Sequence, residues 1–170
     1  NVTTLVVTPV SGLVFHAAVS INEHNWSPDS LRIAFNGDFD FQNIQEAFVV
    51  LRSGAGGRVK LHATLPAGRS AGTPRWAPDG SRISIQGDLV TDGISELFTA
   101  LPTGGVATPV SGTLIAGGQV VAHDWAPDSS RIAFRADRDA DEVFELYTTL
   151  PDGTGTPLQV SVDPVLDGDV

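Results

Sequence analysis

The sequence predicts an all-β protein, a β-propeller built of four-stranded antiparallel blades. Three observations lead to this fold class. A motif that begins with tryptophan recurs at Trp26, Trp76 and Trp125, at intervals of 50 and 49 residues. Each copy is followed by strand-like runs at the same spacing, as expected for a structural repeat. The 18 glycines and 11 prolines are scattered along the chain, which indicates many turns and few helices.

The repeated motif predicts a β-hairpin. It reads Trp26-Ser27-Pro28-Asp29-Ser30 in the first copy, and the other copies begin Trp76-Ala77-Pro78 and Trp125-Ala126-Pro127. Proline fixes φ and the aspartate can bond to its own backbone, so Pro-Asp-Ser/Gly is a turn sequence. A run that starts with Arg-Ile follows each time, so the turn joins a strand that ends at tryptophan to a second strand.

Two further runs complete each repeat. A third run begins with an acid, at Glu46, Glu96 and Glu145, and a fourth comes after a glycine-rich turn, as at Val59-Lys60-Leu61. A meander of four strands cannot bury both of its faces alone, but stacked copies cover one another. Four strands in a repeat of about 40–50 residues are typical of a propeller blade. We expect Trp26, Trp76 and Trp125 to fill the core between blades.

The repeat also predicts how the chain is divided. Thr8-Pro9-Val10-Ser11-Gly12 has the same sequence as the segment that begins at Thr108, so the first segment is expected to be the last strand of another blade. The expected division is 1-12 surplus outer strand, 13-64 blade 1, 65-111 blade 2, 112-162 blade 3 and 163-170 tail. Three blades would form half of a six-bladed ring. A second copy of the chain, or missing blades of a longer chain, would then complete it.

The motif Trp-[Ser/Ala]-Pro-Asp-[Ser/Gly]-x-Arg-Ile, followed by an acidic loop and Glu-[Leu/Ala]-[Phe/Tyr], resembles the TolB-like, WD40-like (PD40) β-propeller repeat. The copy from Trp125 to Gly153 resembles it most. The resemblance implies six blades for a TolB-like ring and a periplasmic or secreted location in a bacterium, but it does not specify a function. Related propellers of seven or eight blades belong to peptidases.

Composition excludes several classes of protein. The chain of 170 residues has no cysteine, which excludes disulfide scaffolds, cysteine-ligated metals and cysteine nucleophiles. Its formal net charge of −10 argues against nucleic acid as a partner, because such binding needs a basic face. No apolar run approaches the ~20 residues of a membrane span, so membrane insertion is not expected.

An acidic loop in the third repeat is the candidate metal site. Alternating carboxylates suit Ca²⁺, and the expected ligands are Asp137, Asp139, Asp141 and Glu145. The first acid and the final glutamate of this loop recur in every repeat. This recurrence equally fits a structural role, in which the acids accept backbone N–H bonds or pair with nearby arginines.

Two histidines occupy equivalent positions, because His24 and His123 each lie two residues before a tryptophan. In a closed ring they are possible channel-lining residues that could bind a metal or titrate near neutral pH. Alternatively, each packs beside its own tryptophan and bonds across blades. His16 and His62 have no equivalents and are expected at the surface or in linkers.

No catalytic motif is present, whether Gly-x-Ser-x-Gly, His-Glu-x-x-His or a Walker loop. The favoured function is therefore a non-enzymatic scaffold for protein or ligand interaction, assembled as a dimer and stabilised by calcium. The first alternative is a fragment of a peptidase- or hydrolase-associated propeller that gates substrate for another domain. A third hypothesis is an enzyme that uses His24, His123 and acids in its own channel.

Overall fold

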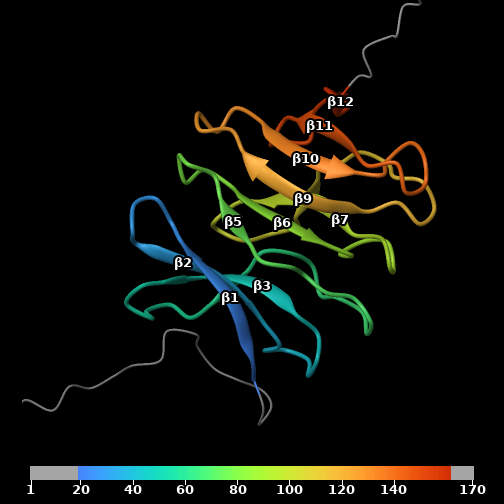
Figure 1. Cartoon of the computed structure of the whole chain (residues 1–170). Coiled ribbons are helices and arrows are strands. Elements are labelled where there is room, and N and C mark those ends of the chain that lie inside the picture. Colours follow the sequence, from blue (N-terminus) through green and yellow to red (C-terminus); the bar gives the residue numbers. More distant parts are fainter. Residues whose placement is uncertain (1–18, 162–170) are drawn as a thin grey trace, which may run out of the picture.

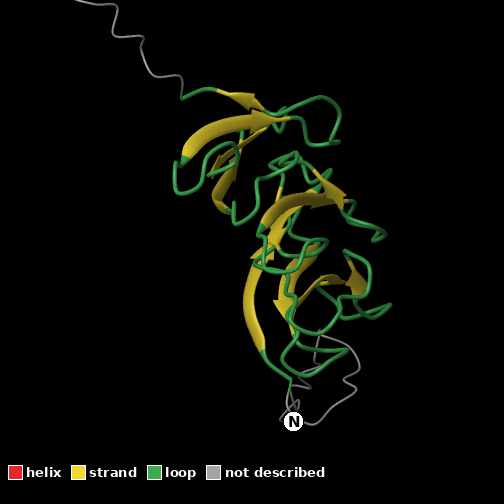
Figure 2. Ribbon diagram, turned by 90° about the vertical axis from the view of Figure 1, so that its right-hand side faces the viewer, coloured by secondary structure: helices red, strands yellow, loops and turns green. Residues whose placement is uncertain are grey.

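The computed structural model describes residues 19–161, which form three four-stranded antiparallel sheets that follow one another along the chain (Figure 1). Each sheet is one blade, and neighbouring strands of a blade are consecutive in sequence. Figure 2 shows the three sheets as successive layers joined by loops. Over the described range there is no apolar helix of the length that a membrane crossing requires.

The strands have the following bounds. Blade 1 contains β1 (Ile21–Trp26), β2 (Arg32–Gly37), β3 (Glu46–Leu51) and β4 (Val59–Lys60). Blade 2 contains β5 (Arg75–Trp76), β6 (Ile83–Gly87), β7 (Glu96–Ala100) and β8 (Thr108–Pro109). Blade 3 contains β9 (Val120–Trp125), β10 (Ile132–Ala136), β11 (Glu145–Thr149) and β12 (Leu158–Gln159). The surplus strand expected at residues 1-12, the tail at 163-170 and His16 lie outside the described residues.

The Pro-Asp turn closes the first hairpin of every blade. In blade 1, Asp29 Oδ1 accepts a hydrogen bond from the Leu31 N–H at 2.9 Å, and Asp79 and Asp128 make the equivalent bonds in the other blades. The next residue has a positive φ, 58° at Ser30 and 73° at Gly80. This left-handed conformation suits glycine and costs a serine free energy. The turn sets the register in which each tryptophan pairs with an isoleucine, as Trp26 does with Ile33.

Most of the core lies between the blades, and a third buried cluster, of Phe35, Phe39, Phe48 and Val50, belongs to blade 1 alone. One cluster of buried side chains joins blade 1 to blade 2 and contains Trp76 and Phe98, and another joins blade 2 to blade 3 and contains Trp125. Both tryptophans are 9% exposed. The Trp76 indole N–H donates to the Asn25 carbonyl at 3.3 Å, and the Trp125 indole donates to the Arg75 carbonyl at 3.3 Å. Each indole therefore docks on the blade that precedes its own.

Trp26 departs from the expectation that all three tryptophans are core residues. Its side chain is 53% exposed, so the core assignment is wrong for this residue. Both buried indoles are covered by the preceding blade, and residues 19–161 contain no blade before blade 1. The burial of this position therefore depends on a neighbouring blade and not on the repeat that carries the residue.

We expect Trp76→Ala to lower the free energy of unfolding by about 3–5 kcal/mol, because it opens a cavity in the joint between blades 1 and 2. Chemical denaturation of the variant and the wild type measures the difference. Val106→Ala, at an exposed side chain of the same blade, is the control and should change stability by less than about 0.5 kcal/mol. A loss of under about 1 kcal/mol for Trp76→Ala would contradict the packing described.

Candidate functional site

The first strands of the three blades border an open cavity of about 530 Å³. It combines acidic side chains, one arginine and the edges of the repeated tryptophans. Its lining residues are Glu23, Asn25, Trp26, Pro28, Thr73, Arg75, Trp76, Pro78, Asp124 and Trp125. Because every blade contributes to it, the cavity depends on the angle at which the blades stack.

Side chains bridge the blades at repeated positions around this cavity. Asn25 Nδ2 donates to the Pro74 carbonyl at 3.0 Å, and Arg75, one repeat later, donates to the His123 carbonyl at 3.5 Å. Further along the second strand, Gln86 Nε2 donates to the Val120 carbonyl at 2.7 Å. These bonds fix the relative position of neighbouring blades, because each donor and its acceptor belong to different blades.

His123 is held in the joint between blades 2 and 3. Its Nε2 lies 2.9 Å from Ser84 Oγ, and the same hydroxyl accepts a bond from the Trp125 indole at 2.9 Å. Burial, reinforced by the positive charge of Arg75 and opposed by Asp124, lowers the pKa of His123 to about 4. His123 is therefore a neutral side chain of the joint at physiological pH.

His24 occupies the equivalent position of blade 1 but is exposed. Blade 2 stands between the two blades that carry His24 and His123 (Figure 1). Within residues 19–161, no three histidine or carboxylate side chains are arranged to hold a metal ion. The structure does not bring the two imidazoles into a shared site.

The first acidic residue of the loop, which recurs at the same position in each repeat, binds backbone N–H groups. Asp137 accepts hydrogen bonds from the backbone N–H groups of Gln119, at 2.5 Å, and Glu142, at 3.3 Å. Asp38 holds the equivalent loop of blade 1 by accepting from the Ser20 and Asn43 N–H groups. In blades 1 and 3 the carboxylate thus ties the entry of the blade to the loop between its second and third strands.

The other expected calcium ligands also have protein partners. The Tyr147 hydroxyl lies within hydrogen-bond distance of two carboxylates, 3.0 Å from Asp139 and 2.7 Å from Glu145, and shares its one proton between them. Glu145 accepts a further bond from Gln159. Burial, with these acceptors, raises the pKa of Tyr147. Asp141 makes no such bond within residues 19–161. The four carboxylates form no common cluster, so the arrangement does not support the calcium expectation.

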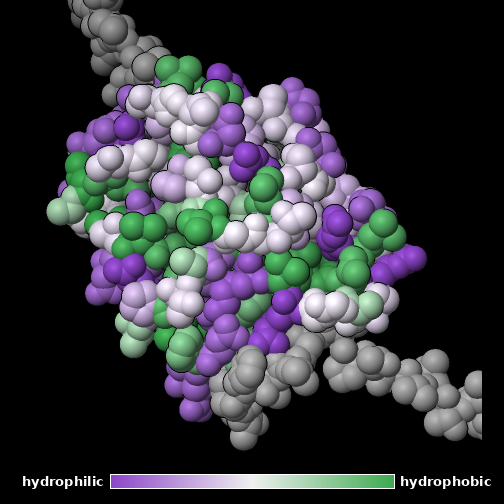
Figure 3. Space-filling view, turned by 180° about the vertical axis from the view of Figure 1, so that it is seen from behind, coloured by the Kyte–Doolittle hydropathy of each residue, from purple (hydrophilic) through white to green (hydrophobic). Residues whose placement is uncertain are grey.

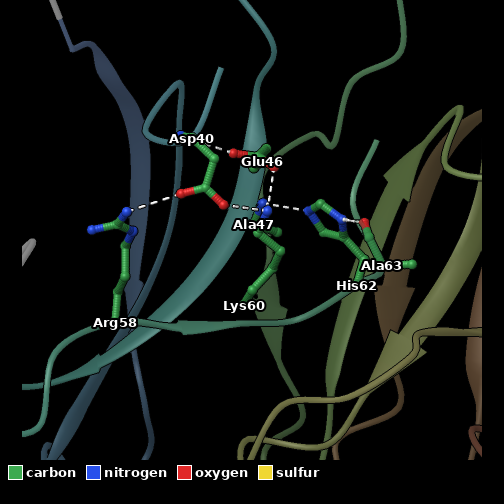
Figure 4. A network of polar contacts seen from close by, with 7 residues as sticks. All are labelled: Asp40, Glu46, Ala47, Arg58, Lys60, His62 and Ala63. Atoms are coloured by element: carbon green, nitrogen blue, oxygen red, sulfur yellow. Dashed lines mark hydrogen bonds and ion pairs between the residues drawn. The ribbon is translucent and has the colours of Figure 1, made fainter. Parts of the chain in front are cut away.

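A partly buried network of charges in blade 1, centred on the buried Glu46, was not anticipated from the sequence (Figure 4). The Lys60 ammonium lies 2.5 Å from both Asp40 and Glu46, and Arg58 lies 2.9 Å from Asp40. Burial raises the pKa of Asp40, but hydrogen bonds from Lys60 and Arg58 outweigh it and hold the pKa below its ordinary value. The Arg58 guanidinium also covers the ring of Phe48 at 5.3 Å.

His62 belongs to the same region. It lies between β4 and β5, in a linker as expected, but it is buried and not at the surface. Its side chain is buried; Nε2 accepts the Ala47 N–H at 2.9 Å and Nδ1 lies 2.6 Å from the Ala63 carbonyl. Burial lowers the pKa of His62, and the Lys60 charge adds to this. The presence of a lysine and a histidine in an otherwise apolar last-strand run was the available signal.

Comparison with known proteins finds similar folds among solved structures. No family model matches the chain, and no curated protein matches its sequence. Among solved structures, a protein assigned as TolB from Agrobacterium tumefaciens matches with TM-score 0.61 and 20% identity, over 84% of this chain and 47% of the other. TolB from Acinetobacter baumannii matches with TM-score 0.51 and 15% identity, over 80% and 31%.

These likenesses show that the three blades have the TolB-like β-propeller fold. The chain spans about half the length of the Agrobacterium protein and about a third of the Acinetobacter protein.

The lowered pKa of the half-buried His123 predicts a pH dependence of stability. Its pKa is about 4 in the folded state against an ordinary 6.5, so the unfolded state binds more protons as the pH falls. Stability should fall by about 2 kcal/mol between pH 8 and pH 5 from this group alone. Denaturation of the wild type and His123→Gln at both pH values tests this. The same change in stability for both proteins would contradict the assignment.

Removing Lys60 should leave the fully buried Glu46 carboxylate without its ammonium. We expect Lys60→Met to lower the free energy of unfolding by about 2–4 kcal/mol, and Glu46→Gln in that background to recover part of the loss. A double-mutant cycle in denaturant measures the coupling, with the exposed Arg52→Met as control. Additive effects of the two substitutions would show that the pair does not interact.

Proposed function

We propose that this chain is a non-enzymatic interaction scaffold in which two copies complete a six-bladed ring. The observation that carries the proposal is the outer face of blade 3. Leu146 is 44% exposed there, whereas Ala47 and Leu97, at the same position of the other blades, are fully buried. Val160 is 42% exposed and its equivalent Val110 is buried. A face of this kind normally packs against another blade.

The contacts between neighbouring blades within the chain indicate which side chain would pack on the outer face of blade 3. A cavity of about 630 Å³ lies on it, bordered by Asp124, Ala133 and Thr148 among others. In the preceding blade, the position of Asp124 is taken by Arg75, whose carbonyl accepts the Trp125 indole N–H. The exposed Trp26 of a second copy is the side chain that fits the equivalent place.

The turns support the same pairing. In the joint between blades 2 and 3, the Asp79 N–H donates to Ser129 Oγ at 3.0 Å. Ser129 and Ser30 share a positive φ, at 62° and 58°. In a joint between two chains, Ser30 of one copy would offer the same hydroxyl to the Asp128 N–H of the other. The exposed face of blade 1 thus carries the indole of Trp26 and the hydroxyl of Ser30, which correspond to the groups that blade 3 places on blade 2.

The two ends of the chain are different surfaces, so each copy would contribute its first blade to one joint and its third blade to the other, related by a twofold axis. Six blades is the number implied by the resemblance to the TolB-like repeat. A periplasmic or secreted location is proposed on that resemblance alone. A partner protein would bind to the completed ring.

A second candidate function follows from the extent of the structural match. The chain covers 47% of the Agrobacterium protein, so the other blades can equally belong to a longer chain. In that case the segment is one part of a larger propeller, such as one that gates substrate for a hydrolase domain.

Size-exclusion chromatography with light scattering at micromolar concentration distinguishes the two candidates. The ring proposal predicts twice the chain mass of 17.8 kDa for the wild type. Trp26→Asp and Leu146→Asp should each give a folded monomer, because a buried charge opposes the joint.

Val106→Asp introduces the same charge at an exposed position in the loop between β7 and β8 and should leave the mass doubled. A folded, monodisperse wild-type monomer would overturn the dimer and favour the segment of a longer chain.

A further inference from the structure

A glutamate opens the third strand of every blade, at Glu46, Glu96 and Glu145. In blades 1 and 3 its carboxylate has a partner from the fourth strand of the same blade. Lys60 Nζ lies 2.5 Å from Glu46 Oε1, and Gln159 Nε2 lies 2.5 Å from Glu145 Oε1. The two donors occupy the same register, since Phe48 pairs with Lys60 and Tyr147 with Gln159.

Blade 2 lacks this donor. Phe98 pairs with Pro109, so a proline stands where the other blades have lysine and glutamine. The proline side chain has no N–H to offer. Glu96 Oε2 is accordingly buried without a hydrogen-bond partner in the described residues. Buried carboxylate oxygens are rarely left in this state, because losing hydration without a replacement bond costs free energy.

A cavity occupies the place of the missing side chain. It has a volume of about 420 Å³ and is bordered by Glu96 and Pro109, together with Thr91, Ile94 and Leu114. Thr91 hydrogen-bonds to the Glu96 carboxyl, and Arg69 contributes a more distant positive charge. Burial raises the pKa of Glu96 despite both groups, so the carboxyl lacks the charge compensation found in blade 1.

We propose that this cavity binds a primary ammonium group carried on an alkyl chain, the group that Lys60 supplies internally in blade 1. The ammonium pairs with the Glu96 carboxylate and donates to the Thr91 hydroxyl oxygen, and the alkyl chain lies against Pro109, Ile94 and Leu114. A charge-assisted hydrogen bond of this type is stronger than a neutral one. The site lies within blade 2 and does not depend on closure of the ring.

The test titrates the full chain with n-butylammonium chloride, followed by NMR of the Glu96 side chain and neighbouring amides. We expect saturable binding with a Kd of about 1 mM, a modest affinity suited to one ion pair in a small cavity. Glu96→Gln should weaken binding at least about tenfold. Pro109→Lys should abolish it, because the new lysine occupies the site. Tetramethylammonium, which has no N–H, should not bind.

Asp92→Asn is the matched control, since it removes an exposed charge from the same loop and should leave the Kd unchanged within about twofold. Pro109→Ala keeps the cavity without adding a cation and should still bind, which keeps the proposal testable if Pro109→Lys does not fold. Equal affinities for the wild type and Glu96→Gln would overturn the proposal. Absence of saturable binding to the wild type would do the same.

A blocked lysine, Nα-acetyl-lysine methylamide, forms a second arm of the titration. Tighter binding of this probe than of butylammonium identifies a protein lysine as the source of the ammonium, and equal binding identifies a small amine. Both results support the site, provided that Glu96→Gln weakens the binding of each probe.

Discussion

The structure depends on the joint between consecutive blades. A four-stranded sheet with apolar side chains on both faces cannot bury either face by itself, so each blade is stable only against a neighbour. The indoles of Trp76 and Trp125 make this dependence specific, because each places its ring on the preceding blade and its N–H on a backbone carbonyl there. The middle blade is covered on both sides, whereas blades 1 and 3 each leave repeat positions exposed, Trp26 in blade 1 and Leu146 in blade 3.

Much of the fold follows from the sequence because the repeat carries its own local signals. The Pro-Asp turn, the Arg-Ile start of the second strand and the glutamate that opens the third strand all lie where spacing predicts them. Trp26 could not be placed in the same way. Its local sequence matches that of Trp76, and the difference in their burial comes entirely from what stands on the other side.

The polar sites were harder to predict, because their partners lie on different strands. Repetition identified Asp38 and Asp137 as equivalent, but only the structure shows that both serve backbone N–H groups. The ion pair of Glu46 and Lys60 depends on the register of β3 and β4. The loop that joins these strands differs in sequence from the equivalent loops of the other blades, so the register could not be read from the repeat. The burial of His62 was missed for the same reason, since its acceptor role toward Ala47 is created by strand pairing.

The joints between blades have a direction, because the indole always belongs to the later blade and the accepting carbonyl to the earlier one. A head-to-tail contact of this kind is heterologous, and repetition either closes it into a ring or extends it into a fibre, according to the rotation at each step. The angle between neighbouring sheets therefore sets the number of units in a closed assembly. Tandem duplication of the coding sequence can add blades without inventing a new contact, which gives such a protein a simple route to larger rings.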